Sequence, residues 1–101
     1  MRAGDKIKLN MKQALYAGMI LDDAIHEGQL HKFDETEECL YLVLTDVPLQ
    51  DISLDAIYEC EIVSENERML CAVRVRERYK SEVGKTLKAE IKNGFYKINI
   101  K

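Results

Sequence analysis

The sequence contains no tryptophan, one proline and three cysteines, and its apolar runs are short. The longest run, residues 14–21, is eight residues with Gly18 inside it, whereas a membrane-spanning helix needs about 20. Asp22 and Asp23 follow without a small-residue cleavage site, so we expect neither a membrane span nor a signal peptide. An odd number of irregularly spaced cysteines does not suggest a disulfide framework, which favours a reduced, cytoplasmic protein.

No strong charge of either sign is present. A net charge of −3 provides no global attraction to nucleic acid or to an anionic membrane. The 101 residues are enough for one domain with one core, and 47% apolar residues is an ordinary share for a globular protein. We therefore expect a single domain over residues 1–101.

Alternation of apolar and polar residues dominates the second half. Residues 85–92 and 95–101 both alternate around Asn93-Gly94, a dipeptide typical of two-residue β-hairpin turns. A two-residue turn would place three apolar pairs on one face, namely Ile91/Tyr96, Ala89/Ile98 and Leu87/Ile100. The sequence thus predicts a hairpin and its register.

A second hairpin is expected between residues 57–63 and 68–80. A four-residue loop at residues 64–67 would pair Ile62 with Met69, Cys60 with Cys71 and Tyr58 with Val73, all on one apolar face. Further strands are predicted at residues 6–10, 29–33 and 39–45, the last buried on both faces. Residues 81–84 would lead into the final hairpin.

Residues 12–25 fit either a helix or a strand. Several alanines favour a helix, whereas Gly18 weakens one and would mark a bulge in a strand. We favour a strand because the remaining segments are β. The fold class predicted is all-β, a small antiparallel split barrel of six or seven strands with at most one short helix.

Four cations are predicted to share one face of a strand: Arg74, Arg76, Arg78 and Lys80. Asp55 should lie near Arg76. One interpretation is a solvated, partly salt-bridged outer face. The other is a site for phosphate or single-stranded nucleic acid, with Tyr79, Phe95 and Tyr96 as stacking platforms.

Other candidate chemistry is sparse. Cys60 and Cys71 would face each other, either as two buried apolar side chains or as a cross-strand disulfide or thiol switch. His26, His31 and Cys39 fit no compact zinc pattern, so we expect surface histidines and no metal. No catalytic triad, glycine-rich phosphate loop or paired-carboxylate motif is present, so we expect no enzyme and no cofactor.

The order of segments resembles the small split barrels associated with PilZ domains, in particular the barrel that precedes PilZ in bacterial flagellar-brake proteins. The segments that carry the resemblance are residues 4–7 (Gly-Asp-Lys-Ile), 15–20 (Leu-Tyr-Ala-Gly-Met-Ile), 40–44 and 58–79. They cover most of the chain by pattern and contain no diagnostic motif.

The resemblance implies a test for cyclic di-GMP binding. PilZ domains that bind it carry Arg-x-x-x-Arg followed by Asp/Asn-x-Ser-x-x-Gly. Here Asp51 and Ser53 are followed by Ala56 in place of the glycine, and the arginine pair, Arg74 and Arg78, lies downstream. The candidate ligand residues, all from these two segments, are Arg74, Arg76, Arg78, Asp51 and Ser53.

The favoured interpretation is a non-enzymatic regulatory or protein-interaction module that acts in bacterial signalling. Its contact surface would be an exposed strand edge or the face at residues 74–80, and its partner another protein or a second copy of the chain. Two alternatives remain. One is a cyclic di-GMP sensor with a degenerate site, and the other is a single-stranded nucleic-acid binder similar to OB-fold proteins.

Overall fold

The computed structural model describes residues 2–13, 25–45, 48–65, 67–92, 94 and 96–99. Within these residues it contains seven β-strands and, as its helical element, one 3-10 turn. The elements in chain order are β1 (Lys6–Gln13), β2 (Ile25–Asp34), β3 (Cys39–Leu44), η1 (Leu49–Asp51), β4 (Ile57–Val63), β5 (Glu67–Ser81), β6 (Gly84–Ile91) and β7 (Tyr96–Asn99). The predicted fold class is confirmed.

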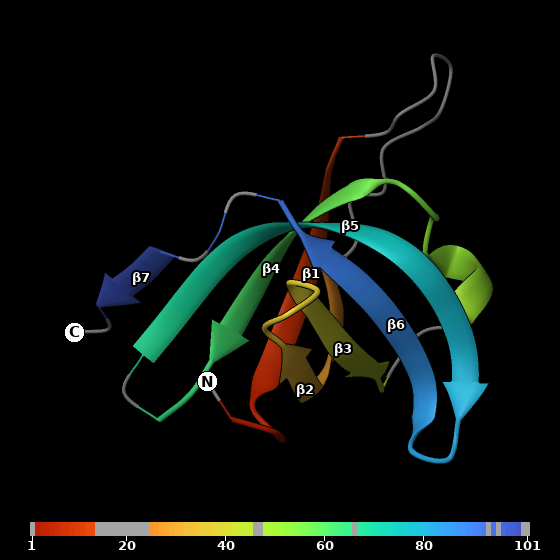
Figure 1. Cartoon of the computed structure of the whole chain (residues 1–101), viewed down its shortest axis with the longest axis horizontal. Helices are drawn as coiled ribbons and strands as arrows, with labels where there is room; N and C mark the ends of the chain where they lie inside the picture. Colours follow the sequence, from red (N-terminus) through yellow and green to blue (C-terminus); the bar gives the residue numbers. More distant parts are fainter. Residues whose placement is uncertain are drawn as a thin grey trace.

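Six of the strands form a closed antiparallel barrel. The sheet order is β4-β1-β2-β3-β6-β5-β7, and an additional pairing of β4 with β5 closes the ring. In Figure 1, β5 arches across the barrel, with β4 beside its first half and β6 beside its second half. Closure gives most strands a hydrogen-bonded neighbour on both edges and so protects them from pairing with other chains.

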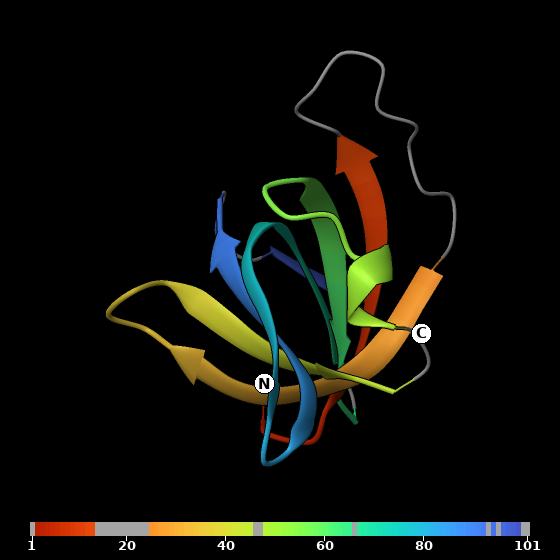
Figure 2. The same cartoon turned by 90° about the vertical axis from the view of Figure 1, so that its right-hand side faces the viewer.

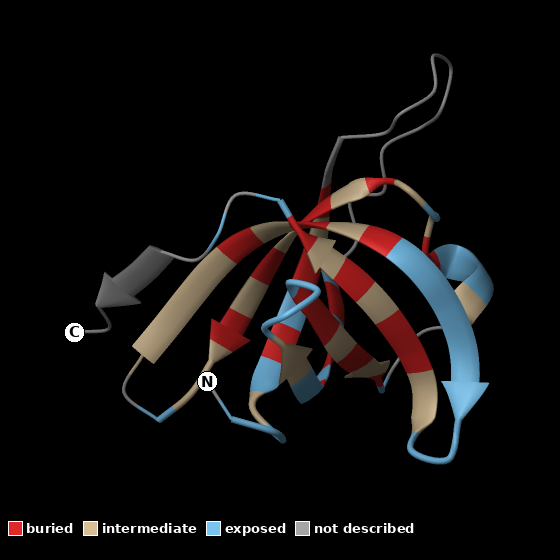
Figure 3. Ribbon diagram, viewed as in Figure 1, coloured by how far each residue is buried: buried red, intermediate tan, exposed pale blue. Residues whose placement is uncertain are grey.

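Apolar side chains at every second position of the strands fill the barrel. In β4, for example, Tyr58, Cys60 and Ile62 are buried, whereas Glu59 and Glu61 between them are half-buried on the outer face. The predicted register of this strand against β5 is confirmed, since Tyr58 pairs with Val73, Cys60 with Cys71 and Ile62 with Met69. Figure 3 shows the resulting banding of buried and exposed positions along the strands.

β3 is not buried on both faces, contrary to the prediction from its continuous apolar run. Leu40, Leu42 and Leu44 are buried in the core, whereas Tyr41 and Val43 on the outer face are half-buried. The Lys32 ammonium lies 4.5 Å from the centre of the Tyr41 ring. β2 and β3 lie side by side (Figure 2), so the Lys32 side chain of β2 covers part of the apolar outer face of β3.

The predicted hairpin at Asn93-Gly94 is wrong. β6 already has β3 on one edge and β5 on the other, so it has no edge left for β7. β7 pairs with the same edge of β5 as β6 does, closer to the start of β5. Ile91 of β6 pairs with Val73, and Tyr96 of β7 pairs with Leu70. The five residue steps from Ile91 to Tyr96 therefore lie along only three residue steps of β5. The side chains of Tyr96 and Ile98, together with Asn93, Phe95 and Ile100, lie outside the described residues.

The last hairpin instead turns at Glu82 and Val83, where the sequence suggested only a connector. Ser81 pairs with Gly84 across this two-residue turn. Gly84 has φ +124°, a backbone conformation that side chains rarely adopt and that glycine adopts freely. A tight turn at this position makes β5 and β6 a long two-stranded ladder.

The N-terminal strands are longer than predicted. The strand expected at residues 6–10 extends to Gln13, and the one expected at 29–33 spans Ile25–Asp34. Residues 14–24, including most of the segment for which helix and strand were both considered, lie outside the described residues.

Gly28 allows β2 to bend from one neighbour to the next. It pairs with Ile7 of β1 and with Leu44 of β3. A Cβ atom built on Gly28 would lie 2.2 Å from the Val43 carbonyl oxygen, well inside van der Waals contact. Glycine at this position therefore lets two backbones approach at a corner of the barrel.

We expect Gly28→Ala to lower the free energy of unfolding by about 3 kcal/mol, the upper end for overpacking, because the clash is with backbone. Urea unfolding followed by circular dichroism measures this. Gln29→Ala, at the exposed neighbouring position, is the control and should change stability by less than about 0.5 kcal/mol. Equal losses in the two variants would contradict the role given to Gly28.

Candidate functional site

A β-bulge at Arg76 divides the predicted row of cations. Val75 pairs with Ala89 and Glu77 with Lys88, so two steps in β5 match one step in β6. The extra residue reverses the alternation of side chains beyond it. Arg74 therefore lies on the outer face, opposite Glu90, whereas Arg78 lies opposite the buried Leu87. The prediction that these arginines share one face is wrong.

Arg78 holds the segment that precedes β4. Residues 48–56 form this segment, and Ile52 within them is fully buried in the core. The Arg78 guanidinium donates hydrogen bonds to the carbonyl oxygens of Ile52 and Leu49, the latter at 3.5 Å. The segment is also fixed from within, because the Ser53 N–H donates to the Tyr58 hydroxyl at 3.0 Å.

Arg76 forms the predicted contact with Asp55. The guanidinium lies 3.4 Å from the Asp55 carboxylate, and both side chains are nearly half exposed. Asp55 has φ +62°, and its N–H donates to the Val75 carbonyl oxygen at 2.8 Å. An exposed pair of this kind contributes little to stability, so the backbone contact does most to fix the segment against β5.

Arg74 lies beside Glu90 on the outer face. A hydrogen bond from Lys92, at 3.0 Å, is the main reason why the pKa of Glu90 is lowered, and the charges of Arg76 and Arg74 add to it. Arg74 Nε is buried and has no hydrogen-bond partner among the residues that the structure describes. Arg74 is thus separated from Arg78 by the thickness of the sheet.

The structure therefore brings Arg76 and Arg78 to the segment that contains Asp51 and Ser53, but it leaves Arg74 on the other face. Arg78 is engaged with backbone carbonyls and Arg76 with Asp55. Two arginines that bind a phosphate bidentately need their guanidinium groups open toward the ligand. The described residues do not present that arrangement.

The second half of β5 forms an exposed arm with the start of β6. We define the arm as residues 76–85, since Thr86 and Leu87 beyond them are buried. Its residues 76–83 are all exposed, so both faces of the β5 strand are open here, as Figure 3 shows. Tyr79 and Val83 are exposed large apolar side chains of the arm, and Leu54 lies exposed two residues after the buried Ile52.

The arm is also locally basic. Its cations are Arg76, Arg78, Lys80 and Lys85, and its acids are Glu77 and Glu82, so its net charge is +2 against −3 for the whole chain. The cations were predicted from the sequence, but the arm was not. The arm depends on the bulge at Arg76, and the residues of this bulge include no glycine or proline that would indicate it.

The outer face beside the arm is electrically balanced. Lys88 lies 2.9 Å from Glu37 and 3.8 Å from Glu77, and the hydrogen bond with Glu37 raises its pKa. Tyr41 is partly covered by Lys32. On this face, the side chains of Lys88 and Lys32 are thus already engaged, the first with carboxylates and the second with the Tyr41 ring.

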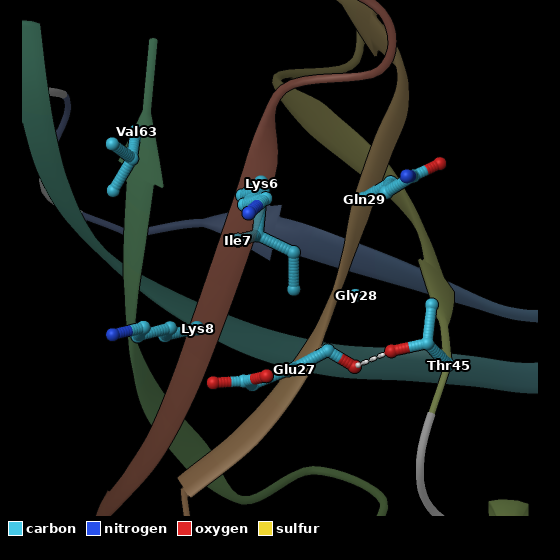
Figure 4. Close-up of a pocket in the computed structure, with 8 residues that line it drawn as sticks. All are labelled: Lys6, Ile7, Lys8, Glu27, Gly28, Gln29, Thr45 and Val63. Atoms are coloured by element: carbon cyan, nitrogen blue, oxygen red, sulfur yellow. Dashed lines mark hydrogen bonds between the residues drawn. The ribbon is translucent and has the colours of Figure 1, made fainter.

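A groove of about 400 Å³ lies elsewhere, on the outer side of β1 and β2 (Figure 4). It is lined by Lys6, Ile7, Lys8, Glu27, Gly28, Gln29, Thr45 and Val63. The Thr45 hydroxyl donates to the Glu27 carbonyl oxygen at 3.2 Å. Lysine and glutamate side chains together give it mixed charge, and it contains no residue of the candidate ligand site.

The histidines and Cys39 do not form a metal site. His26 is buried and meets Tyr58 edge to face, with ring centres 6.4 Å apart, so the expectation of a surface residue is wrong for His26. His31 is exposed, as expected. Among the residues that the structure describes, no three histidine, cysteine, aspartate or glutamate side chains are placed to hold a metal ion.

Cys60 and Cys71 face each other inside the barrel as free thiols. A hydrogen bond between the two, together with burial, raises the pKa of Cys60 well above 9.0. The neutral thiol is therefore the form that the core accommodates.

Comparison with known proteins adds no relative. No protein-family model matches the sequence, and neither the curated proteins nor the solved structures yield a match. In the described part of the chain, no helix is long and apolar enough to span a membrane.

Arg78→Ala should lower the free energy of unfolding by about 1 kcal/mol, because the charged hydrogen bonds to residues 49 and 52 are lost. Urea unfolding measures the loss, and faster amide exchange at Ser53 would localise it. Arg76→Ala is the matched control and should cost less than about 0.5 kcal/mol. If both variants were as stable as the parent, Arg78 would not hold the segment.

Stability should fall as the pH rises above about 9. The Cys60 thiol ionises near 9.0 when the chain is unfolded and only at higher pH when it is folded, so its contribution is complete below pH 9 and is lost above it. Urea unfolding of the reduced protein between pH 7.5 and 9.8 measures the slope. Cys60→Ala should flatten the slope, and an unchanged slope would contradict the assignment.

Proposed function

We propose that the chain is a non-enzymatic, cytoplasmic interaction module of the PilZ-associated kind, and that it contacts a partner protein through the arm. The observation that carries this proposal is the arm itself, in which β5 is exposed on both faces and continues beyond its pairing with β4. An exposed strand edge with apolar side chains tends to pair with other chains. Exposed apolar surface is also typical of protein interaction sites.

Two further observations support an interaction module over a sensor. Arg78 and Arg76 bind the protein's own residues 49–55, and the PilZ-type glycine is replaced by Ala56, which is buried in the core. A regulatory role in signalling would follow from the partner that the arm binds.

Cross-linking tests the proposal. A photoreactive phenylalanine analogue at Tyr79 should give one discrete protein adduct in extract of the source cells, and the adduct should disappear when Lys80→Glu is added. The same analogue at Gln29, an exposed site on β2, is the control. Absence of an adduct at Tyr79, or the same adducts from both sites, would contradict the role of the arm.

Cyclic di-GMP should not stabilise the protein. A ligand that binds only the folded state raises the melting temperature by mass action, so we expect no saturable shift up to millimolar nucleotide in a thermal-shift titration. A saturable shift that Arg78→Ala abolishes would instead establish the sensor function.

A further inference from the structure

The arm has an open backbone edge. On the edge of β5 that faces away from β6, pairing with β4 ends at Arg74, and Val75 makes the last backbone hydrogen bonds, to Asp55 and Ala56. Beyond Val75, no strand among the described residues pairs with this edge. The opposite edge remains paired with β6 as far as Ser81.

The free backbone groups belong to Arg78 and Lys80. Ser81 and Gly84 flank a two-residue turn, so they exchange both of their backbone hydrogen bonds. The direction of the backbone N–H and C=O groups alternates along a strand, so those of Glu77, Tyr79 and Ser81 point toward β6. The N–H and C=O groups of Arg78 and Lys80 point away from β6, toward the open edge.

The side chains along this edge alternate in chemistry. Arg78 and Lys80 lie on one face, opposite Leu87 and Lys85, and Tyr79 lies on the other face, opposite Thr86. Tyr79 is 37% exposed. A strand that paired with this edge would lie opposite Arg78, Tyr79 and Lys80 in turn.

Charge disfavours a second copy of the chain as that strand. In an antiparallel pairing of two such edges, residues with edge-facing groups must pair with each other. The possible pairs are Arg78 with Arg78, Arg78 with Lys80, or Lys80 with Lys80, and each places two cations directly opposite, which is destabilising. The Lys80 charge favours a strand with a carboxylate at the position opposite it. The Arg78 guanidinium is engaged with the carbonyl oxygens of residues 49 and 52, so at Arg78 the backbone groups make the contact.

We propose that the edge at Arg78 and Lys80 binds an extended acidic segment of the partner protein by β-strand addition. Backbone hydrogen bonds to Arg78 and Lys80 provide the affinity, and the partner has an acidic residue opposite Lys80 and an apolar residue beside it, opposite Tyr79. This inference rests on the proposed function and specifies how the arm binds.

A designed peptide tests the mode of binding: acetyl-Ser-Glu-Ile-Glu-Val-Ser-amide, titrated into the isotope-labelled chain and followed by amide NMR shifts. We expect saturable shifts centred on Arg78, Tyr79 and Lys80. N-methylation of the two glutamate residues, whose N–H groups would point toward β5, should abolish binding. N-methylation of the isoleucine and valine residues, whose N–H groups point away, should leave it unchanged.

Matched charge reversals complete the test. Lys80→Glu should weaken peptide binding by about fivefold to tenfold, since an opposite-charge pair becomes a like-charge pair. Lys8→Glu, on an exposed position of β1, should change the affinity by less than about twofold, which excludes a general charge effect.

Equal binding of the two N-methylated peptides, or shifts away from the arm, would overturn strand addition. If that happened while the Tyr79 cross-link persisted, the arm would still be the contact surface and only the mode of binding would be wrong. If the cross-link also failed, the proposed function would fail with it.

Discussion

The backbone hydrogen bonding of β5 is the constraint on which the rest of the structure depends. A strand has two edges, and β5 uses both: β4 occupies one edge, and β6 followed by β7 occupies the other. The pairing with β4 closes the barrel. Closure in turn surrounds the alternating apolar side chains on all sides, so that Tyr58, Leu87 and their neighbours can be fully buried.

The bulge at Arg76 separates the part of β5 that pairs with β4 from the part that pairs with β6 alone. Before the bulge, every second side chain enters the core, as Cys71, Val73 and Val75 do. After it, the alternation is reversed and β4 no longer pairs with the strand. One extra residue thus allows Arg78 to fix residues 49–52, while residues 76–83 remain exposed.

Much of the fold could be predicted from local pattern. The register of Cys60 against Cys71 follows from long alternating runs on both sides of a short loop, where a slip would expose a whole apolar face. The Asn93-Gly94 prediction failed because a turn preference is local, whereas the pairing of β6 depends on which edges other strands have already taken. The residues around Asn93-Gly94 contain no information about which strands occupy the two edges of β6.

For the candidate site, the sequence predicted which charged residues are present but not how they are arranged. Its cations were recognised, and so was the contact between Arg76 and Asp55, because both residues lie close to a well-defined hairpin. The distribution of Arg74 and Arg78 over two faces depends on a bulge without glycine or proline. The buried position of Ile52, which accounts for the role of Arg78, depends on how the barrel closes and not on the sequence around Ile52.

Residue-specific amide hydrogen exchange along β5 tests this account most directly. We predict slow exchange at Cys71 and Val73, whose N–H groups point toward β4, and at Arg74, Glu77, Tyr79 and Ser81, whose N–H groups point toward β6. Arg78 and Lys80 should exchange rapidly. Protection of Arg78 and Lys80 with rapid exchange at Tyr79 would show that the ladder has no bulge at Arg76, and it would contradict both the arm and its open edge.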